Sequence, residues 1–150
     1  MKRTSLKGDA CPVARALDSI GDWWSLLIIR DAFDGMHRFG EFQKSLGVAK
    51  NILTARLSQL VADGILELRP SADGVPYREY HLTAKGQDIF PVIVAMRQWG
   101  ETYFFRRNER HSILVDREKR QPVQKVRVLS KRGKILTGPE TLVKKVRSPK

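Results

Sequence analysis

Residues 39–64 of this 150-residue chain read FGEFQKSLGVAKNILTARLSQLVADG. Apolar residues recur at helical spacing on both sides of a central turn, which predicts a short helix over 39–46 and a longer helix over 50–62. The Gly-Val-Ala sequence at 47–49 predicts a tight turn, and the Asp-Gly pair at 63–64 ends the second helix. Two short helices that meet at a sharp turn have the geometry of a helix-turn-helix motif.

The elements around this motif extend it into a larger fold. Apolar residues at helical spacing predict two earlier helices, over 12–20 and 23–33. After Gly64 the apolar pattern changes to strand alternation, which predicts two strands that begin near Ile65 and Tyr77 and form a hairpin. Three helices followed by a hairpin are the order of a winged helix-turn-helix. The expected fold class is therefore α+β, mainly α.

A long final helix is predicted from Thr83, its N-cap, to about Arg107, and Pro91 should kink or restart it. The apolar stripe of this helix is broader than one small domain needs, so we expect it to form a dimer interface. The stripe consists of Ile89, Val92, Ile93, Met96, Trp99 and Tyr103.

Charge is concentrated at the C-terminal end. Residues 1–105 contain 13 Lys or Arg and 12 Asp or Glu, whereas residues 106–150 contain 15 and 4, so nearly all of the formal net charge of +12 lies there. A basic surface of this kind suggests a polyanionic partner. We expect a DNA-binding and dimerisation domain over 1–107 and a basic tail over 108–150 with one or two short hairpins. The tail is expected to extend a DNA footprint, to hold RNA, or to cover part of the dimer as a solvated hairpin.

The helix over 50–62 has a polar stripe opposite its leucines. Asn can bond adenine through two hydrogen bonds, Lys reaches guanine or phosphate, and Thr or Ala methyl groups contact the thymine methyl group. This composition suits a helix that lies in the major groove of double-stranded DNA, although a solvated helix face has a similar pattern. The candidate base-reading residues are Lys50, Asn51, Thr54, Ala55 and Ser58.

Three arginines near this helix are further candidates for contacts with DNA. Arg56 lies beside the core face, where it would contact a phosphate or form a structural salt bridge. Arg69 and Arg78 lie on the hairpin and are candidates for phosphate or minor-groove contacts, unless they serve only solubility. The hairpin turn between them is poor in basic residues and carries Asp73 at its tip.

The chain resembles the HxlR family of bacterial transcriptional regulators over residues 11 to about 104. The resemblance rests on several motifs in order: Cys11-Pro12-Val13, Arg38-Phe39-Gly40-Glu41-Phe42, Leu53-Thr54-x-Arg56-Leu57, Asp63-Gly64 and Tyr80-x-Leu82-Thr83-x-x-Gly86. It implies a winged-helix homodimer that binds a pseudo-palindromic operator and represses or activates a nearby operon, often in response to electrophiles or oxidants. It also implies that the first helix joins the last in the subunit interface, which adds Val13 and Leu17. Ala49 departs from the family, in which a capping Ser usually opens the base-reading helix.

Cys11 matches the N-terminal cysteine of this family, which in several members reacts with oxidants or electrophiles. A thiol at the start of a helix lies near the positive end of the helix dipole, which favours the reactive thiolate. Because the chain has one cysteine, an oxidised form would be an intersubunit disulfide, a mixed disulfide or a sulfenic acid. The alternative is a buried, inert cysteine that packs the first helix.

Other functions find little support. One cysteine excludes a disulfide within the chain and a zinc finger, and His37, His81 and His111 lie on different predicted elements without the spacing of metal ligands. We expect no metal, no cofactor, no catalytic residues and no membrane partner, and we expect a cytoplasmic location. Aromatic residues would pack the core and the dimer or, alternatively, line an effector pocket: Trp23, Trp24, Trp99, Tyr103, Phe104 and Phe105. The competing function is an architectural or RNA-associated module that uses the tail without sequence preference.

Overall fold

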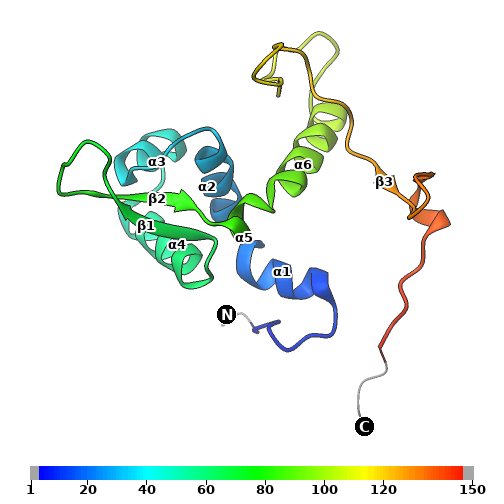
Figure 1. Cartoon of the computed structure of the whole chain (residues 1–150), viewed down its shortest axis with the longest axis horizontal. Coiled ribbons are helices and arrows are strands. Elements are labelled where there is room, and N and C mark those ends of the chain that lie inside the picture. The colour runs from blue at the N-terminus through cyan, green and yellow to red at the C-terminus, as the bar shows by residue number, and fades with distance from the viewer. Residues whose placement is uncertain (1–3, 147–150) are drawn as a thin grey trace. The chain divides into compact units, whose positions relative to one another are not determined.

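The computed structural model describes residues 4–146 (Figure 1). The chain divides into two compact units, Met1–Phe90 and Pro91–Lys150. The first contains the predicted helix-turn-helix and hairpin, and the second contains most of the last helix and the basic tail. The division expected from the sequence, between 1–107 and 108–150, remains a prediction.

Four helices open the first unit, at the positions that the apolar periodicity predicts. They are α1 (Pro12–Ile20), α2 (Trp23–Phe33), α3 (Phe39–Leu46) and α4 (Lys50–Ala62). Their ends follow local chemistry. The backbone N–H of Ser25 donates to Asp22 Oδ1 over 2.9 Å, so Asp22 is the N-cap that starts α2. Gly47, with φ of 60°, ends α3 in the left-handed conformation that a glycine adopts without strain.

The wing is the antiparallel hairpin of β1 (Leu66–Pro70) and β2 (Arg78–Leu82) with its turn, residues 71–77. Leu66 pairs with Leu82 at its base, and Pro70 pairs with Arg78 near its turn. Each strand begins one residue later than the predicted starts at Ile65 and Tyr77, since the paired residues run from Leu66 and from Arg78. The base of the wing packs on α4 through β1 and on α2 through β2.

The core lies where α2 meets α3, α4 and the base of the wing. Its fully buried side chains include Ile28 and Ile29 of α2, Phe42 of α3 and Leu57 of α4. Burial of these aliphatic and aromatic groups is the main contribution to stability. The core therefore packs α3 and α4 together beside the base of the wing.

The predicted single long helix is two helices. Thr83 accepts a hydrogen bond from Gly86 N over 3.1 Å and caps the short α5 (Ala84–Gln87). A new helix, α6 (Phe90–Tyr103), begins with Pro91 in its first turn, because proline is tolerated there and breaks a continuing helix. The expectation of an end near Arg107 was wrong, since α6 ends at Tyr103.

In the second unit the tail is attached to α6 through Gln98. Its side-chain Nε2 donates to the carbonyl of Gln124 over 3.0 Å, and its Oε1 accepts from Val126 N over 2.8 Å. Beyond that point β3 (Val128–Leu129) and β4 (Ile135–Leu136) form a short hairpin, followed by the 3₁₀ helix Gly138–Glu140. None of the described tail residues after Tyr103 is buried.

Candidate nucleic-acid interface

The two faces of α4 lie in opposite environments. Leu53, Leu57 and Leu60 are fully buried, as their spacing predicts. The five candidate base-reading residues are all exposed: Lys50, Asn51, Thr54, Ala55 and Ser58. The helix therefore presents a stripe of polar and small side chains on the side that the core does not use.

Two residues at the start of this stripe keep their full hydrogen-bonding capacity. Within residues 4–146, the side chains of Lys50 and Asn51 form neither a hydrogen bond nor an ion pair. By contrast, the hydroxyl of Thr54 donates to the Lys50 carbonyl over 2.8 Å and is engaged inside the helix. Ala49 is the N-cap of α4 and provides no side-chain hydrogen bond, as its chemistry dictates.

The structure gives Arg56 a protein partner. Its Nε lies 3.5 Å from Asp22 Oδ1, so the side chain links α4 to the N-cap of α2. About two fifths of the Arg56 side chain is still exposed, at 40%. This geometry favours the structural salt bridge of the two roles expected for this residue.

The two wing arginines differ in their surroundings. Arg69 Nε donates to Glu67 Oε1 over 2.6 Å, which balances its charge within β1. Arg78 is exposed at the start of β2 and, among the described residues, has no acidic partner. Arg78 is therefore the better candidate for a phosphate.

A polar cluster that sequence reasoning missed joins the wing to the residue before α3. This wing clamp consists of Arg38, Ser71, Asp73 and Glu79. The Arg38 guanidinium donates to Asp73 Oδ2 over 2.6 Å and to Ser71 Oγ over 3.2 Å, and lies 3.6 Å from Glu79 Oε1. Ser71 and Glu79 are almost fully buried. Asp73, the acidic residue at the tip of the wing, therefore has a partner within the protein.

Hydrogen bonds in and beside the clamp lower the pKa of three carboxyl groups. Hydrogen bonds from Ser71 and then Arg38 lower the pKa of Asp73 to about 2. A hydrogen bond from His81 is the main cause that lowers the pKa of Glu79. On α3, the backbone N–H groups of His37 and Arg38 both donate to Glu41 and lower its pKa. The clamp is therefore ionised near neutral pH.

Two histidines that looked unrelated in sequence lie together beside the clamp. The rings of His37 and His81 stack with centroids 4.1 Å apart, and His81 Nε2 lies 2.9 Å from Glu79 Oε2. A backbone hydrogen bond links the same two segments, from Tyr80 N to the His37 carbonyl over 2.7 Å. Across residues 4–146 no cluster of His, Cys, Asp or Glu has the arrangement of a metal site.

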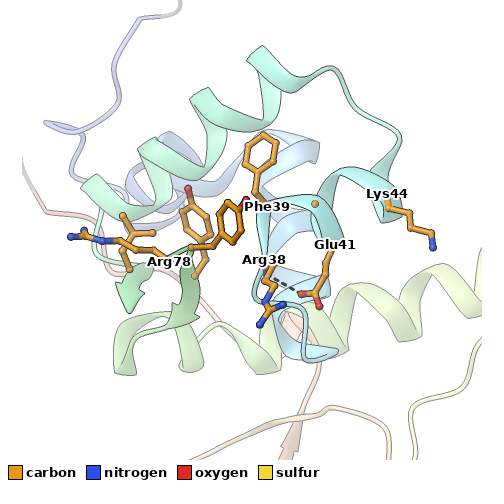
Figure 2. A pocket seen from close by; sticks show the side chains of 9 residues that line it. Arg38, Phe39, Glu41, Lys44 and Arg78 are labelled. Atoms are coloured by element: carbon orange, nitrogen blue, oxygen red, sulfur yellow. Dashed lines mark hydrogen bonds between the residues drawn. The ribbon is translucent and has the colours of Figure 1, made fainter. Parts of the chain in front are cut away.

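A pocket of about 860 Å³ opens between α3 and the wing (Figure 2). We call it the α3–wing pocket. It is lined by Arg38, Phe39, Gly40, Glu41 and Lys44 from the α3 side and by Leu68, Tyr77, Arg78 and Tyr80 from the wing. Of the aromatic residues proposed for an effector pocket, none is among these nine.

Cys11 is exposed and is the N-cap residue of α1, so it does not pack a core as the alternative expectation required. Its backbone N–H donates to Asp9 Oδ1 over 2.7 Å. The thiol is therefore accessible to a reagent at the first turn of the helix.

The residues predicted to form the dimer interface, on α1 and α6, have largely exposed apolar side chains. On α6, Trp99 is 58% and Tyr103 69% exposed, and Val94 is the only buried residue of the helix. On α1, Val13 is 65% and Leu17 47% exposed. The other predicted members are exposed or half-buried: Ile89, Val92, Ile93 and Met96.

A helix-turn-helix with an exposed polar reading stripe and a wing beside it defines a DNA-binding protein of the winged-helix class. The sequence pattern of the HxlR-like helix-turn-helix matches residues 19–109, and the chain belongs to this family of transcriptional regulators. The resemblance inferred from the motifs is thereby confirmed. No helix among residues 4–146 is long and apolar enough to cross a membrane.

Individual proteins similar to this chain are also transcription regulators by name. An uncharacterized HTH-type transcriptional regulator of Mycobacterium tuberculosis is 42% identical over 94 residues, which span 63% of this chain and 60% of that protein. PA1607, described as a transcription factor and known from a crystal structure, is 53% identical in sequence to this chain. The two structures superpose with a TM-score of 0.90 over 95% of this chain and 100% of that one. The redox regulator HypR in its reduced form is 35% identical, with a TM-score of 0.56 over 61% of this chain and 92% of that one. The match to PA1607 thus includes most of the tail, which lies beyond the family's pattern.

Proposed function

We propose that this regulator binds a pseudo-palindromic operator in double-stranded DNA as a homodimer and reads its sequence with α4. One observation carries the proposal: α4 combines a buried leucine face with exposed Lys50 and Asn51, whose side chains bind no other group within residues 4–146. Thr54, Ala55 and Ser58 extend the stripe, and Arg78 would hold a phosphate on the wing side. We expect the protein to act in the cytoplasm, where the DNA lies.

The dimer is part of this proposal because one recognition helix covers only one half-site. The exposed apolar residues of α1 and α6 support it, since side chains such as Trp99 and Tyr103 are costly to leave in water. Such an interface would bring two α4 helices into one dimer, one for each half-site.

Selection of genomic fragments bound by the full chain, followed by footprinting, tests the proposal. We expect a recurrent motif with two inverted half-sites whose centres lie about one helical turn, or a multiple of it, apart. Recovery of fragments without a common motif would contradict sequence reading.

The second candidate is non-specific binding through the basic tail. Thirteen Lys or Arg fall within residues 106–146, and every one of them is exposed. A titration of one labelled duplex with specific and scrambled competitors separates the two functions. Equal competition would favour an architectural or RNA-associated module.

We further propose that Cys11 senses oxidants or electrophiles. Its exposure at the start of α1 supports this, as does the similarity to HypR, which is a redox regulator. An adduct at this position would alter the helix that we assign to the dimer interface, and so the spacing of the two α4 helices.

A further inference from the structure

The α3–wing pocket has the size and lining of a small-molecule site. Its volume of about 860 Å³ lies in the range of ligand pockets. Phe39 of α3 and Leu68, Tyr77 and Tyr80 of the wing give it apolar and aromatic walls. Tyr80 is held in place by an edge-on contact with the buried Phe42, at 6.4 Å between ring centroids. A flat ring is therefore the shape that these walls would stabilise.

The charges at the pocket favour an anion. Two of the four charged lining residues are already engaged, because Arg38 binds Asp73 and Glu41 accepts from two backbone N–H groups. The other two, Lys44 and Arg78, have no acidic partner among residues 4–146. Figure 2 shows them at opposite ends of the pocket. A carboxylate at either end of a bound ring would therefore meet a cation.

Gly40 keeps the α3 wall of the pocket open. It lies in the first turn of α3, where glycine is less favourable than alanine, and its φ is not positive. A Cβ built on Gly40 would meet no atom within 4 Å. The chain itself therefore gives no steric reason for a glycine here, whereas close approach of a ligand to the backbone would.

We infer that the α3–wing pocket is an effector site for a small aromatic carboxylate, whose ring packs against the aromatic walls and whose carboxylate pairs with Arg78 or Lys44. The effector role rests on the proposed function, because Arg78 is also the residue that we assign to a DNA phosphate. A carboxylate on Arg78 would neutralise that charge. A ligand that fills the pocket would also contact both sides of the joint between α3 and the wing, and so weaken binding to DNA.

Calorimetric titration of the full chain with 2-naphthoate tests the site without DNA. We expect one 2-naphthoate per chain and binding of the neutral 2-naphthamide that is weaker by about tenfold or more. Substitution of both cations, Lys44→Gln with Arg78→Gln, should reduce naphthoate affinity to that of the amide. The control is Lys131→Gln with Arg132→Gln, which removes the same charge from the tail and should leave binding unchanged.

The Gly40→Leu variant fills the pocket wall and should abolish naphthoate binding, whereas Gly100→Leu, in a similarly open position on α6, should not. Tyr77→Ala provides a second variant, because this ring is 72% exposed and its loss does not touch the core. We expect it to weaken binding several-fold with unchanged thermal stability. Binding that survives Gly40→Leu, or amide that binds as tightly as naphthoate, overturns the site.

The effector role is tested on the selected operator. Saturating 2-naphthoate should weaken operator binding by the wild type and leave the Gly40→Leu variant unaffected. Naphthoate binding without an effect on the operator overturns the effector role. Failure to select any operator overturns the proposed function instead. The calorimetric test of the site does not depend on that result, because it contains no DNA. If the pocket holds duplex DNA, naphthoate will not bind and Gly40→Leu alone will weaken operator binding, which also overturns the inference.

Discussion

The guanidinium of Arg38, directly before α3, lies 2.6 Å from the carboxylate of Asp73 in the wing turn. Thirty-five positions separate the two residues in the chain. This contact fixes the wing turn against the helix-turn-helix, and Ser71 and Glu79 complete it from the wing side. The position of Arg78 relative to α4 therefore depends on residues that need not touch DNA.

The clamp predicts a pH dependence. The pKa of Asp73 is lowered from 3.8 to about 2 in the folded chain. A lowered pKa contributes stability above the unfolded value, and this contribution is lost as the pH falls through the folded value. We therefore expect Asp73→Asn to be less stable than the wild type at pH 5, and the difference to shrink between about pH 4 and pH 2. Urea unfolding at several pH values measures this. The control is Asp88→Asn, because Asp88 is exposed and its side chain has no hydrogen bond or ion pair among residues 4–146. A difference that persists undiminished at pH 2 would contradict it.

Base reading and backbone positioning predict different effects on DNA affinity. Asn51→Ala should weaken operator binding by about 1–3 kcal/mol and relax the preference at one base pair in each half-site. Arg78→Ala should weaken binding to all duplexes and reduce the slope of affinity against salt by about one unit. Fluorescence titrations on operator and scrambled duplexes at several salt concentrations separate the two. An equal loss on both duplexes for Asn51→Ala would show that Asn51 does not read bases.

Gly86 should not tolerate a side chain. A Cβ there would collide with the carbonyl oxygen of Ile65, a backbone group that cannot move aside because Thr83 N donates to it over 3.0 Å. We expect Gly86→Ala to lower the free energy of unfolding by about 1–3 kcal/mol. Gly40→Ala, in open space on α3, is the matched control and should be neutral or stabilising by up to about 1 kcal/mol. Chemical denaturation of both variants provides the comparison.

Dimerisation should depend on the exposed stripe of α6. Sedimentation of the full chain at micromolar concentration should give about twice the monomer mass of 17.1 kDa. Trp99→Glu places a charge in the proposed interface and should shift the chain toward monomer. Lys119→Glu, on the exposed tail, changes charge outside the stripe and should not. A wild-type chain that sediments as a monomer would refute the interface.

Cys11 should couple oxidation to DNA binding. We expect diamide to modify the exposed thiol and to lower operator affinity of the wild type, and the Cys11→Ser variant to be unaffected. Reactivity alone is insufficient, because sensing requires that the adduct and DNA influence each other's affinity. The measurement is operator affinity before and after treatment. Treated wild type that binds as tightly as untreated would make Cys11 a residue without a sensor role.

The predicted base-reading stripe was visible in sequence because it depends only on helical periodicity. Lys50, Asn51 and Ser58 are exposed for the same reason that Leu53 and Leu57 are buried, namely their positions around one helix. The role of Arg56 could not be chosen from sequence. Its ion pair with Asp22 depends on folding, which brings the Arg56 Nε within 3.5 Å of Asp22 Oδ1.

The sequence by itself determined the elements and their order, since apolar period, caps and turn residues act over a few neighbours. Asp22 starts α2, Gly47 ends α3 and Pro91 restarts the last helix for local reasons. Tertiary structure alone decided the wing clamp, the stacking of His37 on His81 and the α3–wing pocket. Each joins α3, or the residues just before it, to a wing more than 20 residues further along the chain. Such contacts are set by how the core packs α2, α3 and the wing together, which no local pattern encodes.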